Sequence, residues 1–234
     1  MFVVPTGTGK TIVFSNIIRK LVAAGKRVLV LAHRGELLDQ AADKLSKSTG
    51  LRCATEKAGK TADGSLFRVT VGSVQTLMRD NRLKKFRSDH YDVIVVDEAH
   101  HVLANSYQKV LNHFEGARVL GVTATPDRGD RKDLGEFFEE IAYDYPLPQA
   151  IKDGFLCKIS ALTIPLEIDI SGVKSVAGDL QAKGLGTALD PYLEEIANQM
   201  VEHCLDRKTA VFLPLVKTSQ KMSYLLEQRG FDVR

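Results

Sequence analysis

Apolar residues gather in short continuous runs that alternate with segments of helical period. The runs lie at residues 2–4, 28–32, 68–73, 91–96 and 118–122. Between the first two runs, apolar positions recur every three or four residues over 11–24, and they do so again over 37–45. Short, largely apolar strands that alternate with amphipathic helices predict an α/β fold, in which helices cover both faces of a parallel sheet.

The pattern changes after Pro126. We expect a charged loop over 127–131, a short helical face over 134–141, and a non-helical linker over 145–148, where two prolines disfavour a helix. Farther on we expect a strand over 159–170 bent at Pro165, a loop over 171–186, a helix over 192–205, a strand over 209–216 and a helix over 218–228 capped by Gly230.

This organisation predicts one domain over residues 1–147, followed by a linker and the start of an incomplete second domain over 148–234. The two strands expected in this second domain are too few for a self-sufficient parallel sheet. Residues 211–215 should therefore lie on a strand with an unpaired edge. Tyr224, Leu225 and Phe231 should then be incompletely buried.

Composition narrows the class of protein only a little. The chain has 234 residues, of which 44% are hydrophobic, and a formal net charge of +3, which permits anionic partners without arguing for them. Its three cysteines, Cys53, Cys157 and Cys204, form no C-x-x-C pair, so neither a zinc site nor a disulfide framework is indicated. Free thiols favour a reducing cytoplasm, and no apolar run is long enough to span a bilayer.

The first strand leads into a sequence with the features of a phosphate-binding loop. Gly7 and Gly9 allow a tight turn in which backbone N–H groups converge on phosphate oxygens at a helix N-terminus. Lys10 is then placed to reach the β- and γ-phosphates, and Thr11 to offer its hydroxyl to Mg²⁺. Val4 occupies the position where the formal G-x-x-x-x-G-K-[ST] pattern has its first glycine. The residues expected to bind the nucleotide are Pro5, Thr6, Gly7, Thr8, Gly9, Lys10 and Thr11.

A pair of carboxylates follows the most β-branched run of the chain. Asp97 comes directly after Val96 and is placed to hold the metal, while Glu98 is placed to orient or deprotonate an attacking water. Acidic residues at a strand end are also common in ordinary turns. Together with the phosphate loop, however, they predict a nucleoside triphosphatase.

Several motifs then occur in an order that resembles superfamily two helicases of the DEAH type. They are PTGTGKT at 5–11, AHRGEL at 32–37, VGSVQTL at 71–77, VDEAHH at 96–101 and GVTATP at 121–126. The His-Arg-x-Glu-Leu and Thr-Ala-Thr-Pro forms resemble most the branch with restriction-enzyme helicase subunits and RadD-like DNA repair helicases. DEAD-box RNA helicases usually show Asp-Glu-Ala-Asp and Ser-Ala-Thr at the matching places.

The resemblance implies a RecA-like P-loop NTPase sheet followed by a partial second RecA-like domain. It further implies that Lys10, Thr11, Asp97 and Glu98 bind and hydrolyse ATP with Mg²⁺. It implies a coupling role, between nucleotide state and domain movement, for His100, Thr123 and Thr125. Contacts with the nucleic-acid backbone are implied for Arg34, Ser73, Gln75 and Thr76, because small polar groups touch phosphates without reading sequence.

A complete motor of this type would carry an adenine-reading Gln before the first strand and arginine fingers late in its second domain. The chain begins at the first strand and stops before such a motif, so we expect weak turnover, because a missing arginine finger costs ~10³–10⁵ in rate. The expected activity is an ATP-dependent DNA helicase or translocase acting on duplex DNA, with a nuclease or another subunit as a further partner.

An RNA helicase and a non-catalytic ATP-binding scaffold are the alternatives. The basic cluster at residues 79–87 could extend the backbone track, although a solvated helix face is favoured there. His101 and His113 lack a partner pattern and are expected to be structural or surface histidines.

Overall fold

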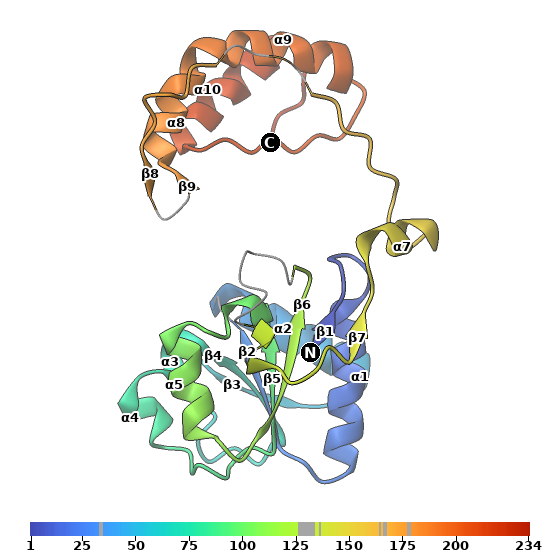
Figure 1. Cartoon of the computed structure of the whole chain (residues 1–234), viewed down its shortest axis with the longest axis vertical. Coiled ribbons are helices and arrows are strands. Elements are labelled where there is room, and N and C mark those ends of the chain that lie inside the picture. The colour runs from blue at the N-terminus through green and yellow to red at the C-terminus, as the bar shows by residue number, and fades with distance from the viewer. Residues whose placement is uncertain (33–34, 126–133, 136, 164, 166–167, 177–178) are drawn as a thin grey trace. The chain divides into compact units, whose positions relative to one another are not determined.

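The chain folds into two compact units, Met1–Lys158 and Ile159–Arg234. The computed structural model describes residues 1–32, 35–125, 134–135, 137–163, 165, 168–176 and 179–234 (Figure 1). Within these residues, no helix has both the length and the apolar character needed to cross a membrane.

A parallel seven-stranded sheet forms the centre of the first unit, in the order β3-β4-β2-β5-β6-β1-β7. The strands are β1 (Phe2–Val3), β2 (Val28–Ala32), β3 (Cys53–Glu56), β4 (Val69–Ser73), β5 (Val93–Asp97), β6 (Arg118–Thr123) and β7 (Tyr143–Asp144). The expected α/β class is therefore confirmed. The short strands β3 and β7 were not anticipated, because CATE and YD carry no continuous apolar run.

Helices cover both faces of this sheet. They are α1 (Lys10–Ala23), α2 (Gly35–Thr49), α3 (Val74–Leu77), α4 (Asp80–Leu83), the 3-10 turn η1 (Ala99–His101) and α5 (Asn105–His113); a further helix, α7 (Leu147–Lys152), follows β7 in the chain. Alternate residues of β2 enter different cores: Val28 and Val30 pack with α1 and α2, whereas Leu29 and Leu31 pack with α3, α4 and α5. This period of two explains why β2 is apolar throughout.

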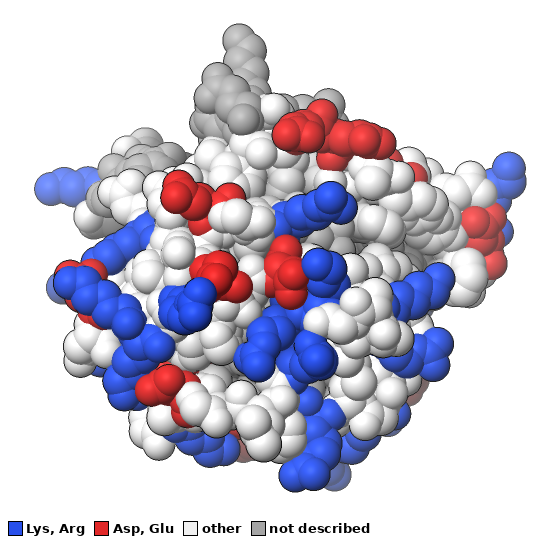
Figure 2. All heavy atoms as spheres, turned by 90° about the horizontal axis from the view of Figure 1, so that it is seen from below, with Lys and Arg blue, Asp and Glu red and all other residues white. Residues whose placement is uncertain are grey.

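Basic side chains gather at the amino-terminal edge of the sheet, on the face seen in Figure 2. Arg68 precedes β4, and its Nη1 donates to the Gly25 carbonyl oxygen just beyond the end of α1, at 2.5 Å. Lys26 pairs with Asp92 at 2.9 Å. Because α1 ends at this edge, Arg68 satisfies a free carbonyl just beyond its last turn and complements the negative end of its dipole. Arg68 and Lys26 therefore have structural roles at this edge.

The basic cluster at 79–87 is also partly structural. Arg82 Nε lies 2.8 Å from Oε1 of Glu56, whose side chain is fully buried, and Arg82 Nη2 donates to the Lys57 carbonyl oxygen at 2.8 Å. A buried carboxylate without such a partner would be costly, so Arg82 is committed to holding β3 against α4.

The second unit is mainly helical. It contains the antiparallel strands β8 (Ser175–Val176) and β9 (Asp179–Leu180), then α8 (Ala182–Leu189), the 3-10 turn η2 (Asp190–Tyr192), α9 (Leu193–Cys204) and α10 (Val216–Glu227). Helices α9 and α10 confirm the predictions over 192–205 and 218–228, and Gly230 has the positive φ of a C-terminal cap. Their shared core contains Leu193, Ala197, Met222, Leu225 and Leu226.

The prediction of two strands in this unit is wrong. The described residues of 159–170 and of 209–215 form no strand, and Val216 already belongs to α10. Ile159 and Phe212 are largely exposed, at 68% and 93%. An apolar β-branched run favours a strand only where a partner strand lies beside it, and none does among the described residues.

Three further expectations need correction. The predicted loop over 171–186 contains the antiparallel strands β8 and β9 and the start of α8. The prolines of 145–148 do not prevent a helix, because Pro148 lies in the first turn of α7, where its missing N–H costs nothing. Tyr224 is exposed as expected and Phe231 is half-buried, but Leu225 is buried against α9.

Amide hydrogen exchange should separate the two units. Residues 209–234 are expected to exchange markedly faster than β2 and β5, because 209–215 lack ladder hydrogen bonds and the core of α9 and α10 is small. Exchange followed by mass spectrometry measures this difference. Equal protection of the two regions would contradict a weaker second unit.

Candidate active site

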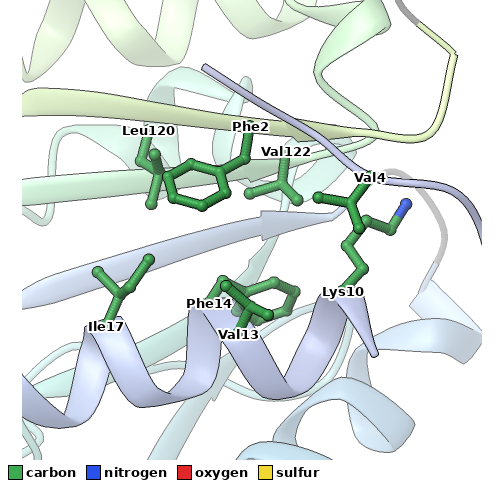
Figure 3. A pocket seen from close by; sticks show the side chains of 8 residues that line it. All are labelled: Phe2, Val4, Lys10, Val13, Phe14, Ile17, Leu120 and Val122. Atoms are coloured by element: carbon green, nitrogen blue, oxygen red, sulfur yellow. The ribbon is translucent and has the colours of Figure 1, made fainter. Parts of the chain in front are cut away.

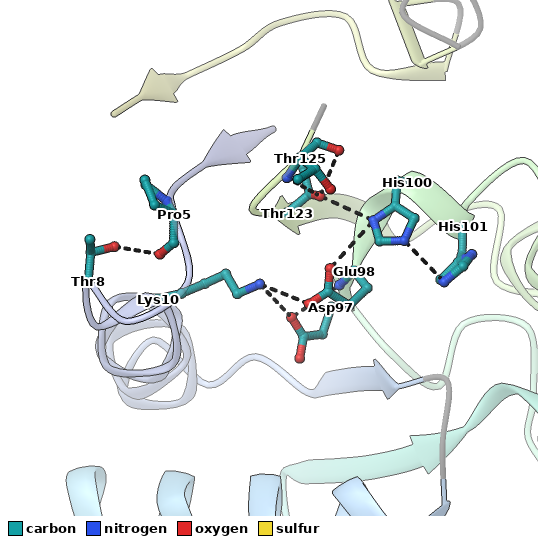
Figure 4. A network of polar contacts seen from close by, with 9 residues as sticks. All are labelled: Pro5, Thr8, Lys10, Asp97, Glu98, His100, His101, Thr123 and Thr125. Carbon is teal, nitrogen blue, oxygen red and sulfur yellow. Dashed lines mark hydrogen bonds and ion pairs between the residues drawn. The ribbon is translucent and has the colours of Figure 1, made fainter. Parts of the chain in front are cut away.

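The carboxyl-terminal edge of the sheet brings together residues that are distant in sequence. Strands β1, β6 and β5 are neighbours in parallel register, with Val3 opposite Thr123 and Val122 opposite Asp97. The loop after β1, the carboxylates after β5 and the threonines after β6 therefore meet at one edge, where parallel α/β sheets bind ligands. Figure 4 shows this group of side chains.

The segment Pro5 to Thr11, hereafter the phosphate loop, leaves its amides available. Gly7 and Gly9 have φ angles of 92° and 89°, which side chains rarely tolerate, and α1 starts at Lys10. Within the described residues, the N–H groups of Gly7, Gly9, Lys10 and Thr11 make no backbone hydrogen bond. Thr8 instead closes the turn, donating from Oγ1 to the Pro5 carbonyl oxygen at 2.7 Å. Unpaired donors at a helix N-terminus suit a phosphate group.

Lys10 connects this loop to the carboxylates. Its Nζ lies 3.1 Å from Glu98 Oε1 and 3.9 Å from Asp97 Oδ1, and its side chain is only 12% exposed. Pro5 is buried, Thr6 is exposed, and Thr8 and Thr11 are half-buried. Beside Lys10, Phe2, Val4, Val13, Phe14 and Leu120 line a small apolar hollow between α1 and the sheet (Figure 3). The Lys10 side chain lines the same hollow, and its ammonium group reaches the carboxylates at the end of β5.

Burial determines the electrostatics of Asp97. Removal from water raises the pKa of this carboxyl above its ordinary value, the Lys10 ammonium lowers it, and the Glu98 carboxylate raises it again. A carboxylate that is costly to keep ionised gains from a cation placed beside it. The donor set of Asp97 with the Thr11 hydroxyl is the hard oxygen set that Mg²⁺ takes, together with phosphate oxygens and water.

Glu98 has a strained backbone. Its φ of 53° and ψ of 56° are left-handed, and among the described residues it is the only non-glycine with a positive φ. Such a conformation costs about 1–3 kcal/mol and occurs where function or packing requires it. Here it turns the chain sharply from β5 into η1, so that the side chains of Asp97 and Glu98 both face Lys10.

A chain of polar contacts runs from Glu98 to β6. His100 Nδ1 lies 3.4 Å from Glu98 Oε2 and 3.3 Å from Thr123 Oγ1. Thr123 Oγ1 accepts from the Thr125 N–H at 3.2 Å. The structure thus brings together the three residues expected to couple nucleotide state to movement.

His101, which was expected to be a structural or surface histidine, extends the same network. Its Nε2 lies 3.1 Å from Nε2 of His100, and its ring stacks on Tyr107 of α5. Adjacent histidines after a carboxylate pair were the only signal in the sequence. Residue spacing could not show that a 3-10 turn would place both rings side by side.

The residues expected to touch nucleic acid lie elsewhere on the edge. Ser73 ends β4, opposite Ala32 of β2, and donates to Gln75 Oε1 at 2.8 Å. Ser73 and Thr76 are buried, whereas Gln75 is exposed. Strand β2 separates β4 from β5, so these residues do not enter the Lys10 network. Arg34 lies outside the described residues.

Comparison with known proteins identifies the group to which this geometry belongs. The family model ResIII, described as type III restriction enzyme, res subunit, matches residues 1–128. The chain belongs to the ResIII family. This confirms the resemblance drawn from the motifs.

Relatives of this ResIII chain are named as helicases and restriction-enzyme subunits. It is 34% identical over 217 residues to the ATP-dependent helicase IRC3 of Saccharomyces cerevisiae, covering 87% of this chain and 31% of that protein. It is 29% identical over 195 residues to the type I restriction enzyme EcoAI endonuclease subunit of Escherichia coli, covering 79% and 24%. The chain therefore spans about a third or less of these relatives.

Solved structures share the fold. A fragment of an HsdR subunit of a type I restriction enzyme from Vibrio vulnificus matches with a TM-score of 0.67 and 24% identity, over 97% of this chain and 41% of that one. The Hef helicase domain of Pyrococcus furiosus matches with a TM-score of 0.56 and 20% identity, over 98% and 50%. The RecA-like fold is thereby confirmed.

The raised pKa of Asp97 predicts a specific pH dependence of stability. Because the folded protein holds this proton more tightly than the unfolded chain, the free energy of unfolding should fall as pH rises from 3.8 through the raised pKa. Asp97→Asn removes that penalty, so the variant should melt at a higher temperature than wild type at neutral pH, with an advantage that shrinks in acid. Calorimetry across this window measures it. A variant less stable than wild type at neutral pH would contradict a net penalty.

Proposed function

We propose that this chain provides the nucleotide-binding half of an ATP-dependent DNA helicase or translocase. The carrying observation is the position of Lys10, at the start of α1 beside unpaired amides and 3.1 Å from Glu98. A cation held between a phosphate-binding loop and two carboxylates fits a nucleoside triphosphate with its Mg²⁺. Family membership and helicase-named relatives support the same assignment.

Each residue then has a defined task. The amides of the phosphate loop and Lys10 bind phosphate oxygens, and Thr11 and Asp97 hold the Mg²⁺. Bound Mg²⁺ neutralises charge that develops on the phosphates during transfer. Glu98 orients a water and accepts its proton, and His100 passes the position of Glu98 to Thr123 and Thr125. Release of Lys10 from Glu98 to the phosphates would free this carboxylate for the water.

Nucleic acid is the proposed partner, with duplex DNA favoured over RNA. Rad25 of Halobacterium salinarum, 30% identical over 231 residues, is named as a DNA 3'-5' helicase, which supports DNA. Exposed Gln75, with Ser73, Thr76 and Arg34, is the proposed contact with the backbone. Phosphate release that duplex DNA stimulates and RNA does not would support this choice; the reverse would favour an RNA helicase.

The relatives also bear on possible further subunits, on the second domain and on the cellular location. Similarity to the EcoAI endonuclease subunit supports a further subunit such as a nuclease. Residues 148–234 are proposed to begin a second RecA-like domain, which the match to 97% of this chain supports. A cytoplasmic location stays a prediction, because a relative in Schizosaccharomyces pombe is named as mitochondrial.

Replacement of Lys10 tests nucleotide binding. Lys10→Ala should weaken MgATP binding by roughly a hundredfold, because charge-assisted bonds to the phosphates are lost, while the protein still folds. Lys20→Ala, an exposed position on the same helix, is the matched control. Calorimetric titration measures both variants. Unchanged affinity in Lys10→Ala would eliminate the phosphate-loop assignment.

Replacement of Glu98 tests hydrolysis. Glu98→Gln should keep MgATP affinity within about threefold yet lose about 10²–10⁴ in turnover, because Gln keeps the shape but accepts no proton. Phosphate release with protein in excess over ATP measures the step, and Glu115→Gln, an exposed position just after α5, is the control. Equal turnover in Glu98→Gln and wild type would exclude the proposed base.

A further inference from the structure

The chain passes the phosphate loop a second time as it leaves the first unit. Residues 145–158, hereafter the exit segment, follow β7 and end at Lys158, the last residue of that unit. The Tyr145 N–H donates to the Val3 carbonyl oxygen at 2.9 Å, which continues the sheet beside the strand that feeds the loop. The exit segment is thus hydrogen-bonded to β1, the strand that leads directly into Pro5 and Gly7.

The exit segment has a fixed internal shape. Helix α7 buries Ala150 completely, and the N–H groups of Phe155 and Leu156 both donate to the Ala150 carbonyl oxygen, at 3.0 and 3.2 Å. Asp153 accepts hydrogen bonds from Tyr145 Oη at 2.8 Å and from Gln149 Nε2 at 2.7 Å. This bonded turn after α7 determines where the following side chain points.

That side chain is Leu156, and it packs on Gly7. A Cβ placed on Gly7 would lie 3.0 Å from Leu156 Cδ2, so the leucine methyl covers the glycine at van der Waals contact. Phe155 and Cys157 on either side are exposed, whereas Leu156 is half-buried. The contact is therefore particular to Leu156, and it falls on a loop residue with a left-handed backbone.

We propose that Leu156 is a positioning residue for the phosphate loop, and that it ties occupancy of the loop to the exit segment. The inference rests on the proposed function. Glycine loses more conformational freedom than any other residue on ordering, so a loop with Gly7 and Gly9 needs outside support to present its amides in one arrangement. Leu156 supplies such support from the segment that joins the two units.

The same contact works in the opposite direction. Phosphate bound to the loop amides restrains Gly7, and the leucine packed on Gly7 is restrained with it. The N–H groups of Phe155 and Leu156 should then open less often, because both belong to the bonded turn that carries this side chain. Nucleotide binding at the phosphate loop thereby changes the stability of the turn at the end of the first unit.

The first experiment measures affinity for the Mg²⁺ complex of a non-hydrolysable ATP analogue in the full chain. Leu156→Ala should weaken binding about fivefold, and Leu156→Met, which restores a flexible apolar contact, should return it to within about twofold of wild type. Leu147→Ala, a partly exposed leucine of α7 without a contact to Gly7, is the control and should bind as wild type. Wild-type affinity in Leu156→Ala would overturn the inference.

The second experiment measures hydrogen exchange with and without the same analogue. In wild type the analogue should slow exchange over residues 147–158, and in Leu156→Ala, at saturating analogue, that slowing should be lost while the phosphate loop itself stays protected. Slowing that persists in Leu156→Ala would overturn the coupling. Failure of wild type to bind the analogue would instead contradict the proposed function, and the inference would fall with it.

Discussion

One lysine ammonium sets the geometry of the candidate site. Asp97 and Glu98 stand side by side at the end of a buried strand, and two carboxylates in partly dry surroundings repel each other unless a cation lies between them. Lys10 supplies that cation from the opposite side of the edge. The distance is short only because β1 is inserted next to β6, one strand away from β5. The strand order of the sheet therefore determines that Lys10 lies beside the two carboxylates.

Close packing beneath the edge serves the same constraint. Gly121 of β6 has no space for a side chain, because a Cβ there would lie 2.3 Å from Phe138 Cζ and 2.9 Å from the Ala99 methyl. The absence of a side chain lets η1 lie flat against β6, which places His100 within reach of Thr123. The left-handed turn at Glu98 and the missing side chain at Gly121 together allow η1 to pack against β6.

The sequence allowed the first unit to be predicted well, because its signals were local. The five predicted strands, the phosphate loop and the Asp97–Glu98 pair each depend on neighbouring residues and on the rule that parallel strands end together. The contact of His101 with His100 and of Leu156 with Gly7 depends on turns whose direction no periodicity encodes. The second unit was mispredicted for a further reason: residues 209–215 have strand composition, but a strand exists only through a partner.

The basic edge described for Figure 2 has a consequence for how the first unit attracts anions. Two of its cations have partners within the protein: Arg68 donates to the Gly25 carbonyl oxygen, and Lys26 pairs with Asp92. At the other edge, the N-terminus of α1 presents fixed peptide dipoles, whose orientation the fold determines. The proposed phosphate site therefore depends on this local geometry and not on net charge. The two edges of the sheet differ in kind, because one presents charged side chains and the other presents the N-terminus of a helix.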